Sequence, residues 1–246
     1  MQLQMDLGKT RGVGQLFKTS LEKSLFSSPA ACIKSIDARL SKLRKKYTDN
    51  EIKDISSLEN LREALVKIKP TDFSRYQQLL HLLHSKEYGW TGATDDRIVI
   101  FTERIETMKY LAEHLRTDLG LKSNAVQDIS GAMSDAEQQE IVENFGREES
   151  SIRILVASDV ASEGLNLHYL SHRMIHFDIP WSLMVFQQRN GRIDRYGQKQ
   201  RPDIRYMLIE SENKRIKGDM RIIEILITKE EQALKNGTPP PEEKAA

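Results

Sequence analysis

The fold of this chain is decided by one apolar run and the polar turn after it: Ile152-Arg153-Ile154-Leu155-Val156-Ala157, then Ser158-Asp159. The run is too apolar for a strand that is buried on one face only, so it predicts a strand of a parallel sheet covered on both faces. Small and polar residues after such a strand lie where α/β sheets place their ligands. Ser158 and Asp159 are therefore expected to bind phosphate, to order an arginine, or to cap an ordinary turn.

Alternating strands and helices surround this run. Strands are predicted at 97–101, 125–129, 173–177 and 204–209, and helices at 108–119, 133–145, from 182 onward and at 216–235. This order predicts an α/β fold from about Gly92 to Ser211, in which a parallel sheet forms the middle of three layers with helices on both faces.

The first third of the chain has helical periodicity only. Apolar residues recur at helical spacing over 16–47, 55–68 and 72–86, with a break at Ser28-Pro29. We therefore expect three parts: a helical segment with loose first residues at 1–90, an α/β lobe at 91–236 and a disordered, proline-rich tail at 237–246.

Composition excludes several classes of protein. The 246 residues carry a net charge of only +1, but basic residues gather at 39–46 and 189–201 and acidic ones at 135–149. A polyanion could bind one face of such a molecule, although each run also reads as a solvated helix face. The single cysteine, Cys32, excludes a disulfide framework and a cysteine-built metal site. Without an apolar leader or membrane-spanning run, a cytoplasmic or nucleoid location is expected, with no membrane partner.

The stretch most informative about chemistry is Gln188-Arg189-Asn190-Gly191-Arg192-Ile193-Asp194-Arg195-Tyr196-Gly197-Gln198. Arg192 and Arg195 are three residues apart, so a helix would place them on one face. Planar, permanently charged guanidinium groups on a rigid element suit bidentate contacts to phosphate. In phosphoryl transfer such a group acts as an arginine finger, which stabilises the charge that develops on the γ-phosphate.

The rest of a nucleotide site is missing from the pattern. Leu7-Gly8-Lys9-Thr10 matches the end of a phosphate-binding loop, but Leu3 stands where its first glycine belongs and no strand precedes it. No acidic box that would hold Mg²⁺ appears, and the histidines lack metal-ligand spacing. The sequence therefore predicts half of a nucleotide site and no metal site.

Taken in order, these segments resemble the second RecA-like lobe, of the P-loop NTPase type, of superfamily-two helicases. The resemblance is closest to the Swi/Snf-type DNA translocases, including their RapA-like branch. The matching pieces are 98–102, 129–131 with the helix to Phe145, 158–167, 177–181 and 188–198. The chain departs from the family pattern at Glu163, where many relatives have arginine, and at Ser182-Leu183, which replaces a common Asn-Pro.

The resemblance implies roles for particular residues. Arg192 and Arg195 would be catalytic fingers that reach an ATP whose Mg²⁺ is held by the absent first lobe. On the nucleotide side it implies positioning or contact roles for Gln188, Gly164, Asn166 and Asp159. On the nucleic-acid side it implies backbone contacts for Thr102, Gly131, Ser158 and Trp181.

The leading hypothesis is the C-terminal motor lobe of an ATP-dependent translocase of double-stranded DNA. Such a lobe would work with an N-terminal RecA-like lobe in cis or in trans, and would be inactive as an ATPase alone. One alternative is a non-catalytic module that docks nucleic acid or protein. Another is the corresponding lobe of an RNA helicase; Trp181 and the ending Arg-Ile-Asp-Arg-Tyr-Gly-Gln favour the DNA branch by resemblance.

Overall fold

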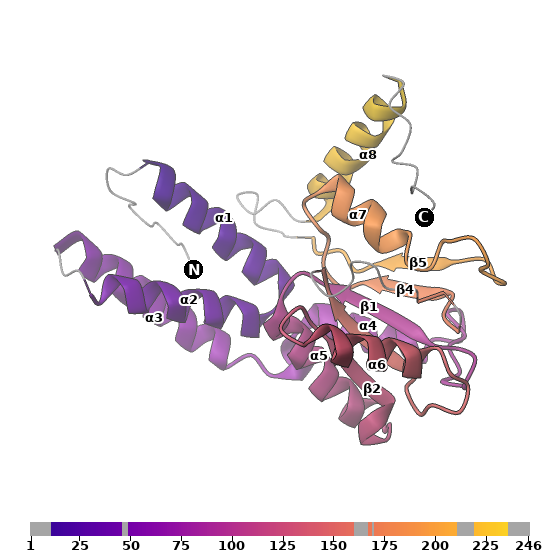
Figure 1. Cartoon of the computed structure of the whole chain (residues 1–246). Coiled ribbons are helices and arrows are strands. Elements are labelled where there is room, and N and C mark those ends of the chain that lie inside the picture. The colour runs from indigo at the N-terminus through magenta and orange to yellow at the C-terminus, as the bar shows by residue number, and fades with distance from the viewer. Residues whose placement is uncertain (1–10, 46–48, 160–166, 169, 211–218, 236–246) are drawn as a thin grey trace.

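A computed structural model describes residues 11–45, 49–159, 167–168, 170–210 and 219–235 (Figure 1). The elements are α1 (Arg11–Ser27), α2 (Pro29–Leu43), α3 (Asp49–Val66), η1 (Pro70–Asp72), α4 (Ser74–His84), β1 (Ile98–Thr102), α5 (Ile105–Asp118), η2 (Ser123–Ala125), β2 (Val126–Ile129), α6 (Asp135–Phe145), β3 (Ile154–Ser158), β4 (Arg173–His176), α7 (Leu183–Asn190), β5 (Asp203–Tyr206) and α8 (Asp219–Lys235). The loop-like expectations for residues 1–10 and 237–246, and the Leu7–Thr10 motif, lie outside the described residues.

The five strands form one parallel sheet in the order β2-β3-β1-β4-β5. β1 and β3 lie at its centre, and every residue of both strands is buried. This is the environment that the apolar run at 152–157 predicts, because helices cover both faces of a parallel sheet. The predicted α/β class and parallel sheet are confirmed.

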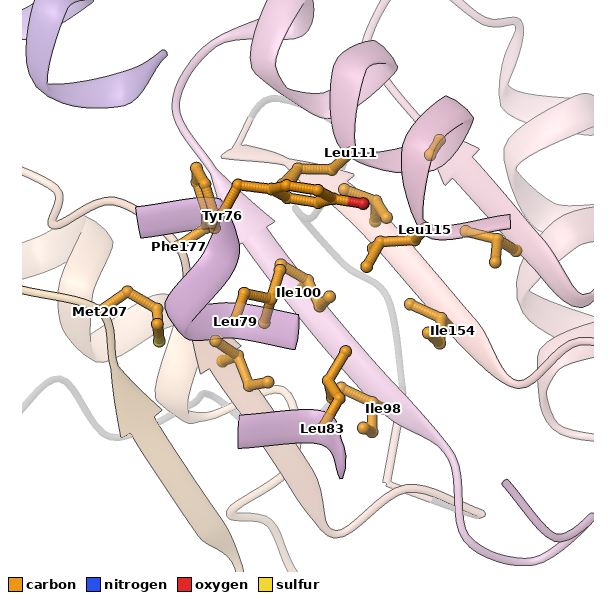
Figure 2. Close-up of a cluster of buried hydrophobic side chains, with 14 of the residues drawn as sticks. Tyr76, Leu79, Leu83, Ile98, Ile100, Leu111, Leu115, Ile154, Phe177 and Met207 are labelled. Atoms are coloured by element: carbon orange, nitrogen blue, oxygen red, sulfur yellow. The ribbon is translucent and has the colours of Figure 1, made fainter. Parts of the chain in front are cut away.

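Two buried clusters fill the spaces on either side of the sheet. Ile98 and Ile100 of β1 point to one side, where they pack with residues of α4 and α5 (Figure 2). Val99 and Phe101 point to the other side, where they pack with Phe145 of α6. This alternation divides one strand between two cores and gives the three predicted layers.

Helix α4 belongs to this α/β part. Its side chains Tyr76, Leu79 and Leu83 are buried against Ile98 and other sheet residues, as Figure 2 shows. The expected boundary near residue 90 places α4 with the helical segment, whereas the packing groups it with the sheet. The difference arises because an amphipathic helix looks the same in sequence whichever core it covers.

The helices α1, α2 and α3 have a core of their own and extend to one side of the sheet (Figure 1). Cys32, Ile36 and Leu58 are buried at its centre. The predicted break at Ser28-Pro29 is confirmed: the Ser28 Oγ accepts a hydrogen bond from the Ala31 N–H at 3.1 Å, and proline occupies the first turn of α2.

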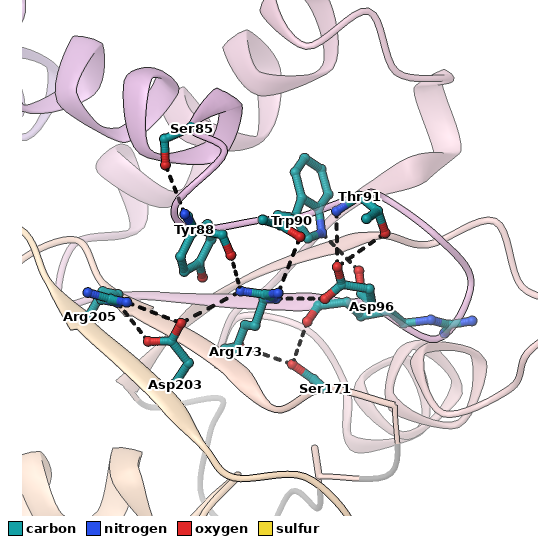
Figure 3. A network of polar contacts seen from close by, with 11 residues as sticks. Ser85, Tyr88, Trp90, Thr91, Asp96, Ser171, Arg173, Asp203 and Arg205 are labelled. Atoms are coloured by element: carbon teal, nitrogen blue, oxygen red, sulfur yellow. Dashed lines mark hydrogen bonds and ion pairs between the residues drawn. The ribbon is translucent and has the colours of Figure 1, made fainter.

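The amino-terminal edge of the sheet is fixed by Arg173 (Figure 3). Its Nε donates to Asp96 Oδ1 at 2.7 Å, and its Nη1 donates to the Tyr88 carbonyl at 2.6 Å. The same Nη1 lies 3.6 Å from a carboxylate oxygen of Asp203 at the start of β5. Arg173 thus ties the start of β4 to the start of β5 and to the segment before β1.

Candidate functional site

The carboxyl ends of the parallel strands meet at the opposite edge of the sheet. Thr102 ends β1, Ser158 ends β3, and Phe177-Asp178 follows β4. The sequence predicted a ligand site at this edge, because α/β sheets bind ligands beyond the carboxyl ends of their strands.

Asp178 is the centre of the polar contacts there. It is 4% exposed, and its Oδ2 accepts hydrogen bonds at 2.6 Å from the Thr102 hydroxyl and at 2.6 Å from the Ser27 hydroxyl. Its Oδ1 accepts from the backbone N–H of Glu103 at 2.8 Å. Three donors on one buried carboxylate offset the cost of removing it from water.

Arg189 of α7 supplies the cation for this edge and is 1% exposed. Its Nε donates to Asp159 Oδ1 at 2.5 Å, and its Nη1 donates to the Asp178 carbonyl at 2.9 Å. Its Nη2 lies 3.6 Å from Asp178 Oδ1. Arg189 therefore ties α7 to the ends of β3 and β4. Of the roles that the sequence left open for Asp159, the structure shows the ordering of an arginine.

A row of hydroxyl groups joins the helical segment to the same carboxylate. The Thr107 hydroxyl of α5 lies 2.7 Å from the hydroxyls of both Ser27 and Ser28. Ser27 in turn donates to Asp178, and all four side chains are buried. The junction of α1 and α2 is thus connected by hydrogen bonds to the residues that hold α7.

The carboxyl group of Glu103, directly after β1, binds its proton more tightly than a free glutamate does. Burial, and secondarily the nearby charge of Asp178, raise its pKa to about 7, against the opposing effect of Lys23. A carboxyl group with this pKa holds or releases a proton near neutral pH.

The turn after α7 presents Arg192 and Arg195. The prediction that a helix carries both on one face is wrong, because α7 ends at Asn190 and the chain turns from Gly191 onward. Both arginine side chains are half-buried, and Ile193 between them is fully buried in the core on that face of the sheet. A tight turn, anchored in the core by the side chain of Ile193, therefore carries the two arginines in place of the expected helix.

The turn is held from its far side as well. Gln198 Nε2 donates to the Ser171 carbonyl at 3.0 Å and to the Ile193 carbonyl at 3.1 Å. His168 lies against the turn, with its Nε2 3.6 Å from where a Cβ on Gly197 would stand, and burial and the positive charge of Arg195 lower its pKa. Gly197 has a φ of +94°, so a side chain at this position would be strained.

The other predicted site residues fall into three groups. Gly164 and Asn166 lie outside the described residues. Gln188 and Gly131 are exposed, and Gln188 makes no described contact with Arg192 or Arg195. Three residues expected on the nucleic-acid side are at least partly shielded from solvent: Thr102 and Ser158 are buried, and Trp181 is half-buried.

Thr102 does not face solvent, since it is fully buried and donates to Asp178. Ser158 is 2% exposed, and its Oγ has no hydrogen-bond partner in the part of the chain described. The ammonium of Lys23 lies 4.5 Å from the centre of the Trp181 ring, a cation–π contact that brings α1 over this edge.

Sequence reasoning missed three residues of this site: Asp178, Arg189 and His176, the residue that ends β4. Asp178 and Arg189 lie within the matching pieces 177–181 and 188–198, but the sequence assigns neither residue a role of its own. No local signal in the sequence separates Arg189 from the exposed cations of the same run, because its burial depends on contacts with Asp159 and Asp178 at the ends of β3 and β4.

Other kinds of site are not apparent in the described ranges. No group of three or more His, Cys, Asp or Glu residues gathers there to hold a metal ion. None of the helices described is long and apolar enough to cross a membrane.

Comparison with known proteins gives a family match over half of the chain. The family described as the helicase conserved C-terminal domain matches residues 74–197, which run from the start of α4 through the turn with Arg192 and Arg195. The match begins at α4 and therefore agrees with the packing of that helix on the sheet.

Two relatives match the same length of chain. The RNA polymerase-associated protein RapA of Vibrio campbellii is 30% identical over 109 residues, which are 44% of this chain and 11% of that protein. The human probable ATP-dependent RNA helicase DDX43 is also 30% identical over 109 residues, 44% of this chain and 16% of that protein. The matches thus span a small part of each relative's length.

Among solved structures, the helicase domain of Hef from Pyrococcus furiosus has a similar fold. The TM-score is 0.50 at 20% sequence identity, and the likeness covers 78% of this chain and 37% of that one. At this identity the likeness supports the RecA-like fold.

Proposed function

The chain belongs to the helicase conserved C-terminal domain family of superfamily-two helicases, and we propose that it is the C-terminal motor lobe of a Swi/Snf-type translocase of double-stranded DNA. One observation carries this proposal. Arg192 and Arg195 stand half-exposed on a turn whose neighbours Arg189 and Ile193 are completely buried. Such a turn holds two guanidinium groups in place before a ligand arrives, which is what an arginine finger requires.

The proposed partner of this edge is ATP on a second lobe. Arg192 and Arg195 act on the γ-phosphate, while an N-terminal RecA-like lobe, in cis or in trans, holds the phosphates and Mg²⁺. Gln188, Gly164, Asn166 and Asp159 keep the nucleotide-side roles that the resemblance implies, with Asp159 acting through Arg189. Because the fingers are one half of the site, this lobe alone hydrolyses little or no ATP.

The proposed nucleic-acid side lies along the same strand ends. The hydroxyl of Ser158 is buried without a hydrogen-bond partner among the described residues, which suits a contact to a ligand oxygen. Gly131 is exposed after the end of β2, and Trp181 is half-exposed after the end of β4. Thr102 contributes by ordering Asp178. The match to RapA supports the Swi/Snf branch, and the match to DDX43 at equal identity makes RNA the alternative substrate.

The test measures ATP hydrolysis by the complete protein with no nucleic acid, with duplex DNA and with duplex RNA. Arg192→Ala and Arg195→Ala are each expected to lower turnover on the order of a thousandfold. Lys199→Ala and Arg201→Ala are matched controls, because they remove exposed cations of the same basic run. The controls are expected to weaken nucleic-acid binding slightly and to leave turnover intact.

Each outcome decides between the hypotheses. Turnover that survives both finger substitutions refutes the finger assignment. Stimulation by RNA and not by DNA assigns the chain to the RNA helicase branch. Nucleic-acid binding without any turnover in the complete protein favours the non-catalytic docking module.

A further inference from the structure

His176 ends β4 and lies completely buried between the sheet and α7. Its ring stacks on that of Tyr206 of β5, with 4.8 Å between centres, and on that of Phe186 of α7, with 5.6 Å. An imidazole among aromatic rings could be read as simple core packing. The contacts of its two ring nitrogens indicate a role beyond core packing.

Both ring nitrogens contact the last turn of α7. Nδ1 lies 3.3 Å from Nη1 of Arg189, and Nε2 lies 2.9 Å from Oδ1 of Asn190. A guanidinium can only donate hydrogen bonds, so Nδ1 of His176 must accept and must carry no proton. The proton is therefore on Nε2, which donates to the Asn190 amide oxygen. This network fixes one neutral tautomer.

The surroundings of the ring oppose a second proton. Burial and the positive charge of Arg189 lower the pKa of His176 to about 3, outweighing the opposite effects of Asn190 and Asp178. The ring therefore stays neutral at physiological pH, and the contact to Arg189 persists.

Arg189 and Asn190 also carry the backbone of the following turn. The Arg192 N–H donates to the Arg189 carbonyl at 3.0 Å, and the Asp194 N–H donates to the Asn190 carbonyl at 3.0 Å. His176 thus contacts the side chains of Arg189 and Asn190, and the backbone carbonyls of the same two residues accept hydrogen bonds from the turn.

We infer that His176 is a positioning residue that, through Arg189 and Asn190, sets the place of the Arg192 guanidinium. This inference rests on the proposed function, since it gives His176 a task in ATP hydrolysis. His176 is buried and touches no reacting atom, so it acts through the last turn of α7. Displacing a catalytic group by about 1 Å can cost on the order of a hundredfold in rate, so a modest shift of this turn is sufficient to impair turnover.

The first test replaces His176 by phenylalanine, which keeps a stacked ring and removes both hydrogen-bonding nitrogens. In the complete protein, kcat for nucleic-acid-stimulated ATP hydrolysis is expected to fall about 10- to 100-fold with KM for ATP unchanged. His172→Phe is the matched control: the same change at the residue just before the opposite end of β4 is expected to leave kcat intact. Asn190→Leu removes the partner of Nε2, together with a long 3.5 Å hydrogen bond from Asn190 Nδ2 to the Tyr206 hydroxyl, and should lower kcat in the same direction.

A second measurement does not depend on hydrolysis. Nitrogen-15 NMR of the histidine rings in this chain should show His176 with an unprotonated Nδ1 and a protected Nε2–H, unchanged from about pH 5 to 8. Asn190→Leu should speed exchange of that ring proton. Because this readout monitors the ring itself, it remains available if His176→Phe fails to fold.

The outcomes separate the two proposals. A kcat that is unchanged in His176→Phe and in Asn190→Leu, in a protein whose Arg192→Ala variant is inactive, overturns the positioning role and leaves the proposed function standing. A ring that titrates near neutral pH, or that carries its proton on Nδ1, overturns the geometry itself. If wild-type protein hydrolyses no ATP, the proposed function fails and the positioning role falls with it, whatever the NMR shows.

Discussion

The ion pair between Arg75 and Asp219 gives the sharpest stability prediction. Arg75 of α4 and Asp219, the first residue of α8, are paired through Arg75 Nη2 and Asp219 Oδ2, and their side chains are 1% and 3% exposed. The same carboxylate accepts the Ile209 N–H at 3.0 Å. Nε and Nη1 of Arg75 are buried without a hydrogen-bond partner among the described residues, so their desolvation is only partly offset.

Removing one partner leaves the other as an uncompensated buried charge. We therefore expect Arg75→Met to cost about 3–5 kcal/mol of unfolding free energy, and Asp219→Asn a similar amount. With an m-value of about 3 kcal/mol/M in urea, this lowers the unfolding midpoint by about 1–1.7 M. The double variant carries neither charge and keeps an amide oxygen for the Ile209 N–H. It is expected to lose only about 1–2 kcal/mol.

The assay is urea unfolding followed by circular dichroism and by tryptophan fluorescence, for wild type, both single variants and the double variant. The double-mutant cycle gives the coupling between Arg75 and Asp219, expected to be several kcal/mol in the favourable direction. Losses that simply add in the double variant would show that the two side chains act independently, and would refute the reasoning.

Three further predictions concern other buried or partly buried polar groups. Arg97 is fully buried and donates to backbone carbonyls at the carboxyl end of α6, among them that of Phe145. Arg97→Met should therefore lower the free energy of unfolding, measured in urea, by about 3 kcal/mol or more, and Arg97→Lys should lower it by less. Burial and the charge of Asp178 raise the pKa of Glu103 from 4.5 to about 7, so the folded state binds this proton more tightly than the unfolded state does. The free energy of unfolding should therefore fall as the pH rises from 4.5 to 7. Equal pH profiles of this free energy for wild type and Glu103→Gln would contradict the prediction. Ser27→Ala removes a buried donor to Asp178 and should lower the free energy of unfolding, measured by thermal denaturation, by about 1.5–3 kcal/mol. Ser27→Thr keeps the hydroxyl and should retain most of that free energy.

The sheet was predictable from the sequence because each strand had a local signal. The run at 152–157 is apolar at successive positions, and in the structure every residue of β3 is buried. The capping box of α6 was equally local: the Ser134 Oγ accepts from the Glu137 N–H, and the Glu137 carboxylate accepts from the Ser134 N–H. Features determined within a few residues could be inferred from those residues alone.

The contacts of the candidate site were not predictable in the same way. Asp178 binds Ser27, which is 151 positions away in the sequence, and Thr102, which is 76 positions away. Hydrogen bonds over such separations depend on the register of β1 and β4 and on where the helical segment docks. The prediction that a helix carries Arg192 and Arg195 is wrong for a related reason. After α7 ends at Asn190, Ile193 packs into a core that forms only when the sheet assembles.

The position of β5 bears on how parts of this chain would behave in isolation. The family match ends at residue 197, before β5 begins at Asp203. A piece cut at that point would expose the free edge of β4, with the buried side chains Met174 and Ile175, to pairing with strands of other molecules. In the whole chain β5 takes that edge and carries the ion pair of Asp203 and Arg205, with 2.6 Å between Oδ1 and Nε. Charged side chains discourage a further strand from adding, so we expect the segment outside the family match to protect the sheet from edge-to-edge aggregation.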